Sequence, residues 1–232
     1  MTTAWHLVLL FVGSYLLGSV SFGLLVSRIG GVDIRCHGSG NLGATNVGRI
    51  LGRKWGILVF MLDVTKGALA TIGAGVYLAY ANNELPTTFH THPDLVPLGA
   101  GICCVIGNIA PFYLGFKGGK GVATSLGVIL GIYPYLTWPG LVTFGVWAAV
   151  VKLSRYISLG SIVAACVLPI AFVGSAWISD WLLADHYPLL GLCLAMAALV
   201  LLRHRSNIGR LLSGTENKIG NGRMKDEKGL SA

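Results

Sequence analysis

The sequence predicts an all-α integral membrane protein, a bundle of about seven transmembrane helices with glycine-rich active-site loops on the cytoplasmic side. Of its 232 residues, 54% are hydrophobic and only 11% are charged, against about 25% charged residues in soluble domains. The mean hydropathy is +0.71, and apolar runs recur that are long enough to cross a hydrocarbon core of about 30 Å. These runs use nearly the whole chain, so any chemistry falls to the loops between them.

Seven apolar runs define the predicted spans, and the first is kept as a span because it is too long for a signal peptide and lacks basic residues before it. The fourth and fifth runs are short and are separated by Pro134, so a single re-entrant pair is the alternative to two spans. A membrane domain is expected over 1–216 and a flexible basic cytoplasmic tail over 217–232. The predicted spans cover residues 5–27, 55–80, 96–115, 122–133, 137–151, 159–183 and 187–202.

The distribution of positive charge predicts the orientation. Loops 81–95 and 180–187 contain no Lys or Arg, so the positive-inside rule places the N-terminus outside and the C-terminus in the cytoplasm. The net charge of +8 then reflects this signal and attraction to anionic membrane lipids, and we expect no nucleic-acid partner. Sixteen of the 17 Lys and Arg residues fall in segments 28–54, 117–120, 152–155 and 203–232.

The five cysteines show no CxxC or Cys/His spacing, so we expect neither a disulfide nor a metal site.

The first cytoplasmic loop has the composition of an anion cradle. Glycines let backbone N–H groups converge on an anion, and hydroxyl, amide and guanidinium groups add further donors. A GxGxxG match is present, but no βαβ unit surrounds it, so it does not indicate a dinucleotide site. A flexible connector is the alternative, although it would need none of these polar side chains. The residues expected to bind phosphate or another anion are Gly38, Ser39, Gly40, Asn41, Thr45, Asn46 and Arg49.

The second glycine-rich loop precedes the fourth apolar run. It fails the P-loop pattern because Gly121, and not Ser or Thr, follows Lys120. Glycine-rich backbone at a helix N-terminus nevertheless offers N–H groups and a positive dipole end to a phosphate. The alternative is a pair of ordinary positive-inside lysines. Substrate binding is predicted for Lys117, Gly118, Gly119, Lys120 and Gly121.

Further polar residues follow the last span and interrupt the second. His204 and Asn207 are three residues apart, so they share one face of a helix that continues from the last span. Asp63 and Lys66 lie inside a span at the same spacing and are expected to pair, either as support for the site or as a purely structural bridge.

Taken in order, these motifs resemble the bacterial acyl-phosphate:glycerol-3-phosphate acyltransferases, the PlsY family, over about residues 18–216. The resemblance implies an inner-membrane enzyme that needs no cofactor. Its partners would be acyl phosphate, glycerol 3-phosphate and membrane lipids, and it would move a fatty acyl group to the sn-1 hydroxyl of glycerol 3-phosphate, releasing lysophosphatidic acid and phosphate. It implies catalytic roles for Ser39, Arg49, His204 and Asn207, substrate binding at the second loop and Ser158, and structural support from Asp63, Lys66 and Glu216.

Two positions depart from the family pattern. Asn108 replaces the usual His of a G-H-x-x-P motif, and Leu42 replaces a usual Pro in the first loop. Asn108 cannot transfer a proton as a histidine does, but its amide can still donate and accept hydrogen bonds in a structural role. A transporter of a phosphorylated solute is the competing class. It would place its polar residues near the bilayer midplane and often show inverted repeats, and we detect none.

Overall fold

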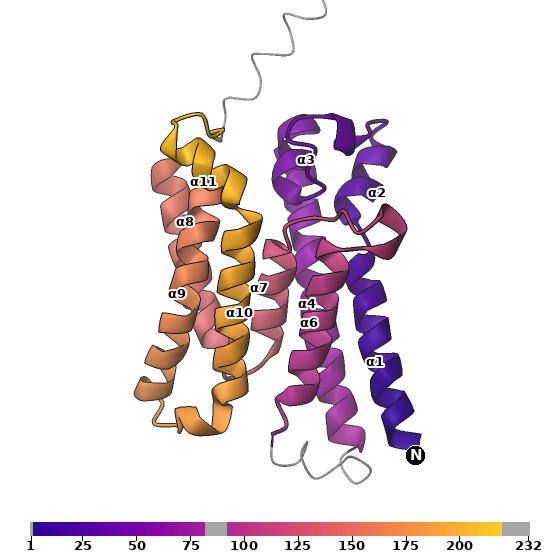
Figure 1. Cartoon of the computed structure of the whole chain (residues 1–232), viewed down its shortest axis with the longest axis vertical. Helices are drawn as coiled ribbons and strands as arrows, with labels where there is room; N and C mark the ends of the chain where they lie inside the picture. Colours follow the sequence, from indigo (N-terminus) through magenta and orange to yellow (C-terminus); the bar gives the residue numbers. More distant parts are fainter. Residues whose placement is uncertain (1, 82–91, 220–232) are drawn as a thin grey trace, which may run out of the picture.

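The computed structural model of the protein describes residues 2–81 and 92–219, and every regular element in these two ranges is a helix. The longer helices form a bundle (Figure 1). The elements are α1 (Thr2–Ser19), α2 (Phe22–Ile29), η1 (Ile34–Cys36), α3 (Ala44–Ile50), α4 (Arg53–Ala81), α6 (Leu95–Ile109), η3 (Phe112–Leu114), α7 (Val122–Gly131), α8 (Thr137–Ser154), α9 (Ile157–Ile178), η4 (Leu183–His186), α10 (Tyr187–Arg203) and α11 (Arg205–Leu212).

Five helical segments are long and apolar enough to cross a membrane, and they match the first, second, third, sixth and seventh predicted spans. The fourth predicted span is α7, whose 10 residues rise only about 15 Å, half of the hydrocarbon core. The fifth is α8, with 18 residues. The chain is thus a multi-pass integral membrane protein, and the exact count of seven spans stays a prediction. The five segments are Trp5–Ile29, Arg53–Ala81, Leu95–Leu114, Ile157–Ile178 and Leu183–Arg203.

The bundle has two groups of helices with α7 between them (Figure 1). In the first group α4 packs against α1, α6 and α7, and in the second α9 packs against α8 and α10. The N-terminus lies at one end of the bundle, and α3 and α11 lie at the other (Figure 1). Buried side chains from α6, α7, α9 and α10 join the two groups in one apolar core, which includes Val105, Val128, Phe172, Leu189 and Met196.

Two glycines let α4 and α7 approach backbone to backbone. A Cβ added to Gly67 would lie 2.2 Å from the carbonyl oxygen of Thr124, and one added to Gly127 would lie 1.9 Å from that of Val64. Neither position therefore accepts even a methyl group without a backbone shift. This contact fixes the start of α7, where Lys120 lies, against the helix that carries Lys66.

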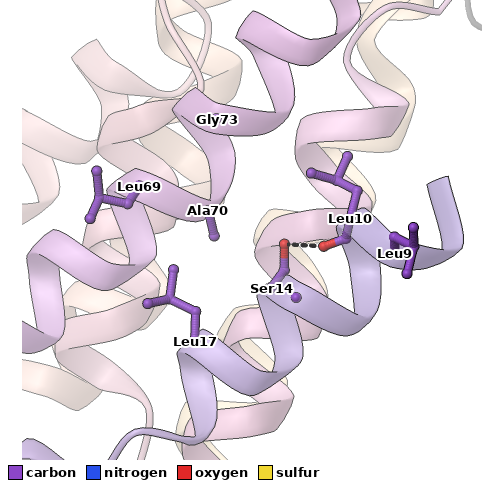
Figure 2. A pocket seen from close by; sticks show the side chains of 8 residues that line it. Leu9, Leu10, Ser14, Leu17, Leu69, Ala70 and Gly73 are labelled. Atoms are coloured by element: carbon purple, nitrogen blue, oxygen red, sulfur yellow. Dashed lines mark hydrogen bonds between the residues drawn. The ribbon is translucent and has the colours of Figure 1, made fainter. Parts of the chain in front are cut away.

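A groove of about 300 Å³ runs between α1 and α4 (Figure 2). Its one hydroxyl, on Ser14, donates a hydrogen bond of 2.8 Å to the carbonyl of Leu10 within the same helix. The groove therefore presents an apolar surface to the membrane, with no unsatisfied side-chain polar group. Its lining residues are Leu9, Leu10, Gly13, Ser14, Leu17, Leu69, Ala70 and Gly73.

We predict that Gly127→Ala destabilises the protein by about 1–3 kcal/mol, because the added methyl forces α7 away from α4. Thermal unfolding in detergent would measure the change. Gly73→Ala is the matched control, since nothing lies within 4 Å of its added Cβ. Removing a helical glycine there should leave stability unchanged or raise it by about 0.5–1 kcal/mol. Equal effects of the two substitutions would contradict the close contact of α4 and α7.

Candidate active site

Asn46 organises the first cytoplasmic loop. Its side chain is 1% exposed; its Oδ1 accepts a hydrogen bond of 3.0 Å from the Ser39 N–H, and its Nδ2 donates one of 3.0 Å to the His37 carbonyl. Gly38 has φ 61°, and a Cβ there would lie 2.4 Å from Asn46 Oδ1. The amide that the sequence assigned to substrate binding is thus already used to shape the loop.

The same loop leaves other polar side chains available. Ser39 and Thr45 are exposed, and Arg49 is half-buried on α3. Arg49 makes no hydrogen bond or ion pair with any residue that the structure describes. Asn41 closes a local turn, its Oδ1 accepting a hydrogen bond of 3.0 Å from the Gly43 N–H. Leu42, at the position where the family usually has Pro, is 6% exposed and belongs to a small apolar core.

The second glycine-rich loop folds back onto the end of α6. The Gly118 N–H donates to the Ile109 carbonyl at 2.9 Å, and the Gly119 N–H donates to the Asn108 carbonyl at 3.0 Å. A Cβ on Gly118 would lie 2.2 Å from the Asn108 carbonyl oxygen. The N–H groups of Gly118 and Gly119 are therefore not free for a phosphate, contrary to the expectation for these two glycines. The N–H of Gly121 has no hydrogen-bond partner among the described residues.

The remaining residues of this loop face other partners. Lys117 is exposed. Gly121 caps the N-terminus of α7 with φ 78°, in the left-handed region that favours glycine. Lys120 is half-buried beside this cap, and its Nζ donates a hydrogen bond to Asn207 Oδ1.

The carboxylate of Glu216 joins the C-terminal polar residues into one network. Its Oε1 accepts hydrogen bonds from Ser158 Oγ at 2.8 Å and Asn207 Nδ2 at 2.7 Å, and its Oε2 lies 2.7 Å from Arg210 Nε. Burial alone would raise the pKa of Glu216, but the hydrogen bonds from Asn207, Ser158 and Arg210 outweigh it and lower that pKa. Glu216 is thus a carboxylate near neutral pH, and its bond to Nδ2 leaves Asn207 Oδ1 facing Lys120.

Burial shifts the pKa values of Lys120 and His204. Desolvation lowers the pKa of Lys120 to about 8, against the attraction of Glu216. His204 is 3% exposed, and burial, followed by the charge of Lys120, lowers its pKa to about 4. Its Nδ1 lies 2.8 Å from the Val200 carbonyl, so Nδ1 carries the proton and its N–H donates a hydrogen bond to that carbonyl. His204 is therefore neutral near pH 7, with an unprotonated Nε2.

Lys66 anchors a buried polar cluster between α2, α4 and α6. Its Nζ lies 2.7 Å from Asp63 Oδ1, so the expected pair is present. The same Nζ donates to Asn108 Oδ1 at 2.7 Å and to the Val20 carbonyl at 2.8 Å. That carbonyl lies at the break between α1 and α2. Asn108 thus accepts a hydrogen bond where the family usually has a histidine, as the expected structural role requires.

Two contacts were not indicated by any sequence pattern. Arg203 donates a hydrogen bond of 2.9 Å to the Gly119 carbonyl, which ties the end of α10 to the second loop. The backbone N–H of Ile219 donates to the Arg155 carbonyl at 2.9 Å, and the Arg155 guanidinium donates back to the Ile219 carbonyl at 2.9 Å. The start of the predicted tail is therefore fastened to the turn between α8 and α9. The rest of that tail, 220–232, lies outside the described residues.

Helices α3 and α11, which carry Arg49 and Asn207, lie at the same end of the bundle (Figure 1). Hydrogen bonds join Lys120, Ser158, Asn207 and Glu216 into one neighbourhood. His204 lies close enough for the charge of Lys120 to lower its pKa. No hydrogen bond or ion pair among residues 2–81 and 92–219 joins this neighbourhood to the side chains of the first loop. The structure thus holds two polar groups at one end and does not link them directly.

Comparison with known proteins identifies the family. A family model described as glycerol-3-phosphate acyltransferase matches residues 8–214. A glycerol-3-phosphate acyltransferase of Thermosynechococcus vestitus is 41% identical over 221 residues, covering 95% of this chain and 98% of the relative. One from a Nostoc species is 44% identical over 214 residues, covering 89% of each chain.

Solved structures agree with this family. A crystal structure of PlsY, described as an integral membrane glycerol 3-phosphate acyltransferase in its glycerol 3-phosphate form, is 37% identical. It superposes with a TM-score of 0.75, covering 93% of this chain and 96% of that one. The lysophosphatidic acid form gives a TM-score of 0.73 at 36% identity. None of these comparisons supports a transporter, and the chain belongs to the glycerol-3-phosphate acyltransferase family of integral membrane proteins.

Proposed function

We propose that this membrane glycerol-3-phosphate acyltransferase takes its acyl group from an acyl phosphate and transfers it to the sn-1 hydroxyl of glycerol 3-phosphate. The observation that carries the proposal is the excess of positive charge at one end of an apolar bundle. Arg210 pairs with the carboxylate of Glu216 there, whereas Lys120 donates to the amide oxygen of Asn207. Arg49 has no acidic partner among the described residues. Both proposed substrates are anions, one soluble and one a lipid, so a cationic site at a membrane surface suits both.

The proposed orientation places this end in the cytoplasm and the N-terminus outside, in a bacterial inner membrane. It rests on the Lys and Arg residues of the loops. These residues lie in the segments that contain α3 and α11 and in those that precede α7 and α9. Cytoplasmic glycerol 3-phosphate would then reach the site directly, and the acyl phosphate would reach it from the inner leaflet.

The reaction would need no covalent intermediate. An acyl phosphate is a mixed anhydride and is already activated. The hydroxyl oxygen of glycerol 3-phosphate attacks the acyl carbon, the bond from that carbon to the phosphate oxygen breaks, and phosphate leaves with the electron pair. The hydroxyl proton ends on the departing phosphate. The protein then has to align the two substrates and stabilise the negative charge that develops.

Each substrate would be held by a different group of residues. Arg49, with Ser39 beside it in the first loop, would bind the phosphate of the donor. The phosphate of the acceptor would lie near Lys117 and Lys120 at the start of α7, with contacts from their side chains because the amides of Gly118 and Gly119 are occupied. This division gives the donor to the segment before α4 and the acceptor to the loop that precedes α7.

His204 would orient the acceptor hydroxyl and not carry its proton away. Its pKa of about 4 makes it a weak base. Its unprotonated Nε2 can nevertheless accept a hydrogen bond from the hydroxyl and so direct the oxygen lone pair at the acyl carbon. Asn207, fixed between Lys120 and Glu216, would support the same alignment.

We expect purified protein to form lysophosphatidic acid from palmitoyl phosphate and glycerol 3-phosphate, and to show no comparable turnover with palmitoyl-CoA. The described residues include no soluble domain that would hold a nucleotide. Mass spectrometry of the lipid product would measure both reactions in the same preparation. Comparable rates with the two donors would refute the choice of donor while leaving acyl transfer intact.

Arg49→Ala and Arg49→Lys should both lower kcat/KM for the acyl phosphate by about 100-fold or more. A planar guanidinium can hold two phosphate oxygens at once, and an ammonium cannot. Steady-state kinetics with the donor concentration varied would measure the loss, and Arg53→Lys is a control at an exposed position nearby. Full activity of the Arg49→Lys variant would exclude two-point binding.

Ser39 should never become acylated. No His–Asp pair activates this hydroxyl within the described residues, and a serine is a weak nucleophile without one. The protein would be incubated with radiolabelled acyl phosphate without glycerol 3-phosphate, then quenched and digested. We expect no stoichiometric label on the Ser39 peptide. Label that is chased off by added glycerol 3-phosphate would establish an acyl-enzyme in place of direct transfer.

A further inference from the structure

A hollow of about 380 Å³ opens on the outer surface where α10 passes into α11. It is lined by Leu202, Arg203, Arg205 and Ser206. His204 lies in the middle of this stretch and points inward, where it is 3% exposed. Because His204 turns into the bundle, the residues on either side of it turn outward and surround the hollow.

The two arginines give the hollow a positive charge, and neither forms an ion pair with an acid in the part of the chain that the structure describes. Arg205 has no hydrogen bond or ion pair with any residue in 2–81 or 92–219. Arg203 donates one N–H to the Gly119 carbonyl and has no carboxylate partner in 2–81 or 92–219 either. The only acid in the adjoining network, Glu216, already accepts hydrogen bonds from Ser158, Asn207 and Arg210.

The hollow lies at the depth of a lipid headgroup. The last membrane-crossing segment ends at Arg203, so Arg203 and Arg205 lie where the span leaves the hydrocarbon. Leu202, on the membrane side of the hollow, is 68% exposed. A ligand there would meet two guanidinium groups and a serine hydroxyl on its polar side and a leucine on its apolar side.

We infer that this hollow binds the phosphate group of an anionic membrane phospholipid, at a place separate from the substrate contacts proposed above. Guanidinium groups bind phosphate oxygens through paired charge-assisted hydrogen bonds. A phospholipid satisfies both halves of the hollow, because its phosphate meets the arginines while its glycerol and acyl chains extend along Leu202. A free phosphate would satisfy only the polar half.

The bound lipid would act on the acceptor side of the reaction. Arg203 contacts both the hollow and the carbonyl of Gly119, and Gly119 directly precedes Lys120. A phosphate held by Arg203 and Arg205 would fix the Arg203 side chain and so hold the second loop in place. Anionic lipid should therefore lower the KM for glycerol 3-phosphate more than it changes kcat.

The test uses full-length protein in nanodiscs of phosphatidylcholine, with and without phosphatidylglycerol. Native mass spectrometry would count bound phosphatidylglycerol, and acyl-transfer assays would give the KM for glycerol 3-phosphate. Arg205→Gln should weaken phosphatidylglycerol binding by about tenfold, or about 1.4 kcal/mol. It should also abolish the lipid-dependent fall in KM, while activity in pure phosphatidylcholine stays near that of the unmodified protein.

Arg53→Gln is the matched control, because Arg53 is also exposed and basic at the start of α4 but lies outside the hollow. It should bind phosphatidylglycerol normally. Equal losses in the two variants would mean that only the general surface charge matters, and would overturn the site. Inorganic phosphate that displaces the lipid at a similar concentration would overturn it as well, in favour of a site for soluble anions. The binding measurement does not require turnover, so its outcome is independent of the acyl donor.

Discussion

The carboxylate of Glu216 holds together the polar end of this bundle. It accepts hydrogen bonds from Ser158 at the start of α9 and from Asn207 on α11, and it pairs with Arg210. Through Asn207 it also fixes Lys120, which lies 87 residues before Asn207 in the chain. Removing this one charge would leave three donors without an acceptor, and unpaired buried polar groups are costly. The arrangement of the proposed acceptor site therefore depends on a residue that need not touch either substrate.

The membrane explains why the polar groups collect at one end. Hydrocarbon offers no hydrogen-bond partners, so a polar group inside the bundle must be satisfied by protein. Within a described span, Lys66 meets this condition through Asn108 and the Val20 carbonyl freed by the helix break, and its ammonium compensates the charge of Asp63. Elsewhere helices pack closely without polar side chains, as where Gly67 and Gly127 let the backbones of α4 and α7 approach each other. The loops outside the hydrocarbon are then free to carry anion-binding groups.

Sequence reasoning was accurate where the signal is local. Long apolar runs gave five membrane-crossing helices, and the i, i+3 spacing gave the pair of Asp63 and Lys66. It failed where a contact joins distant segments: no pattern indicates that the Gly118 amide bonds to α6. Asn46 was predicted to bind substrate because the composition of a loop does not show which of its polar groups form hydrogen bonds within the loop itself. The shortness of α7 was visible in its apolar run, but its depth in the bundle depends on packing.

The position of Glu216 along the chain has a consequence for how the protein is made. Synthesis proceeds from the N-terminus, so every membrane-crossing segment is complete before Glu216 leaves the ribosome. Until that moment Asn207 and Ser158 have no common acceptor, and the pairing of Ile219 with Arg155 has not formed. A chain that is still being inserted can therefore contain all of its spans and yet lack the contacts that arrange the proposed acceptor site. The hydrogen bonds of Glu216 therefore join helices whose chain segments are all made before it.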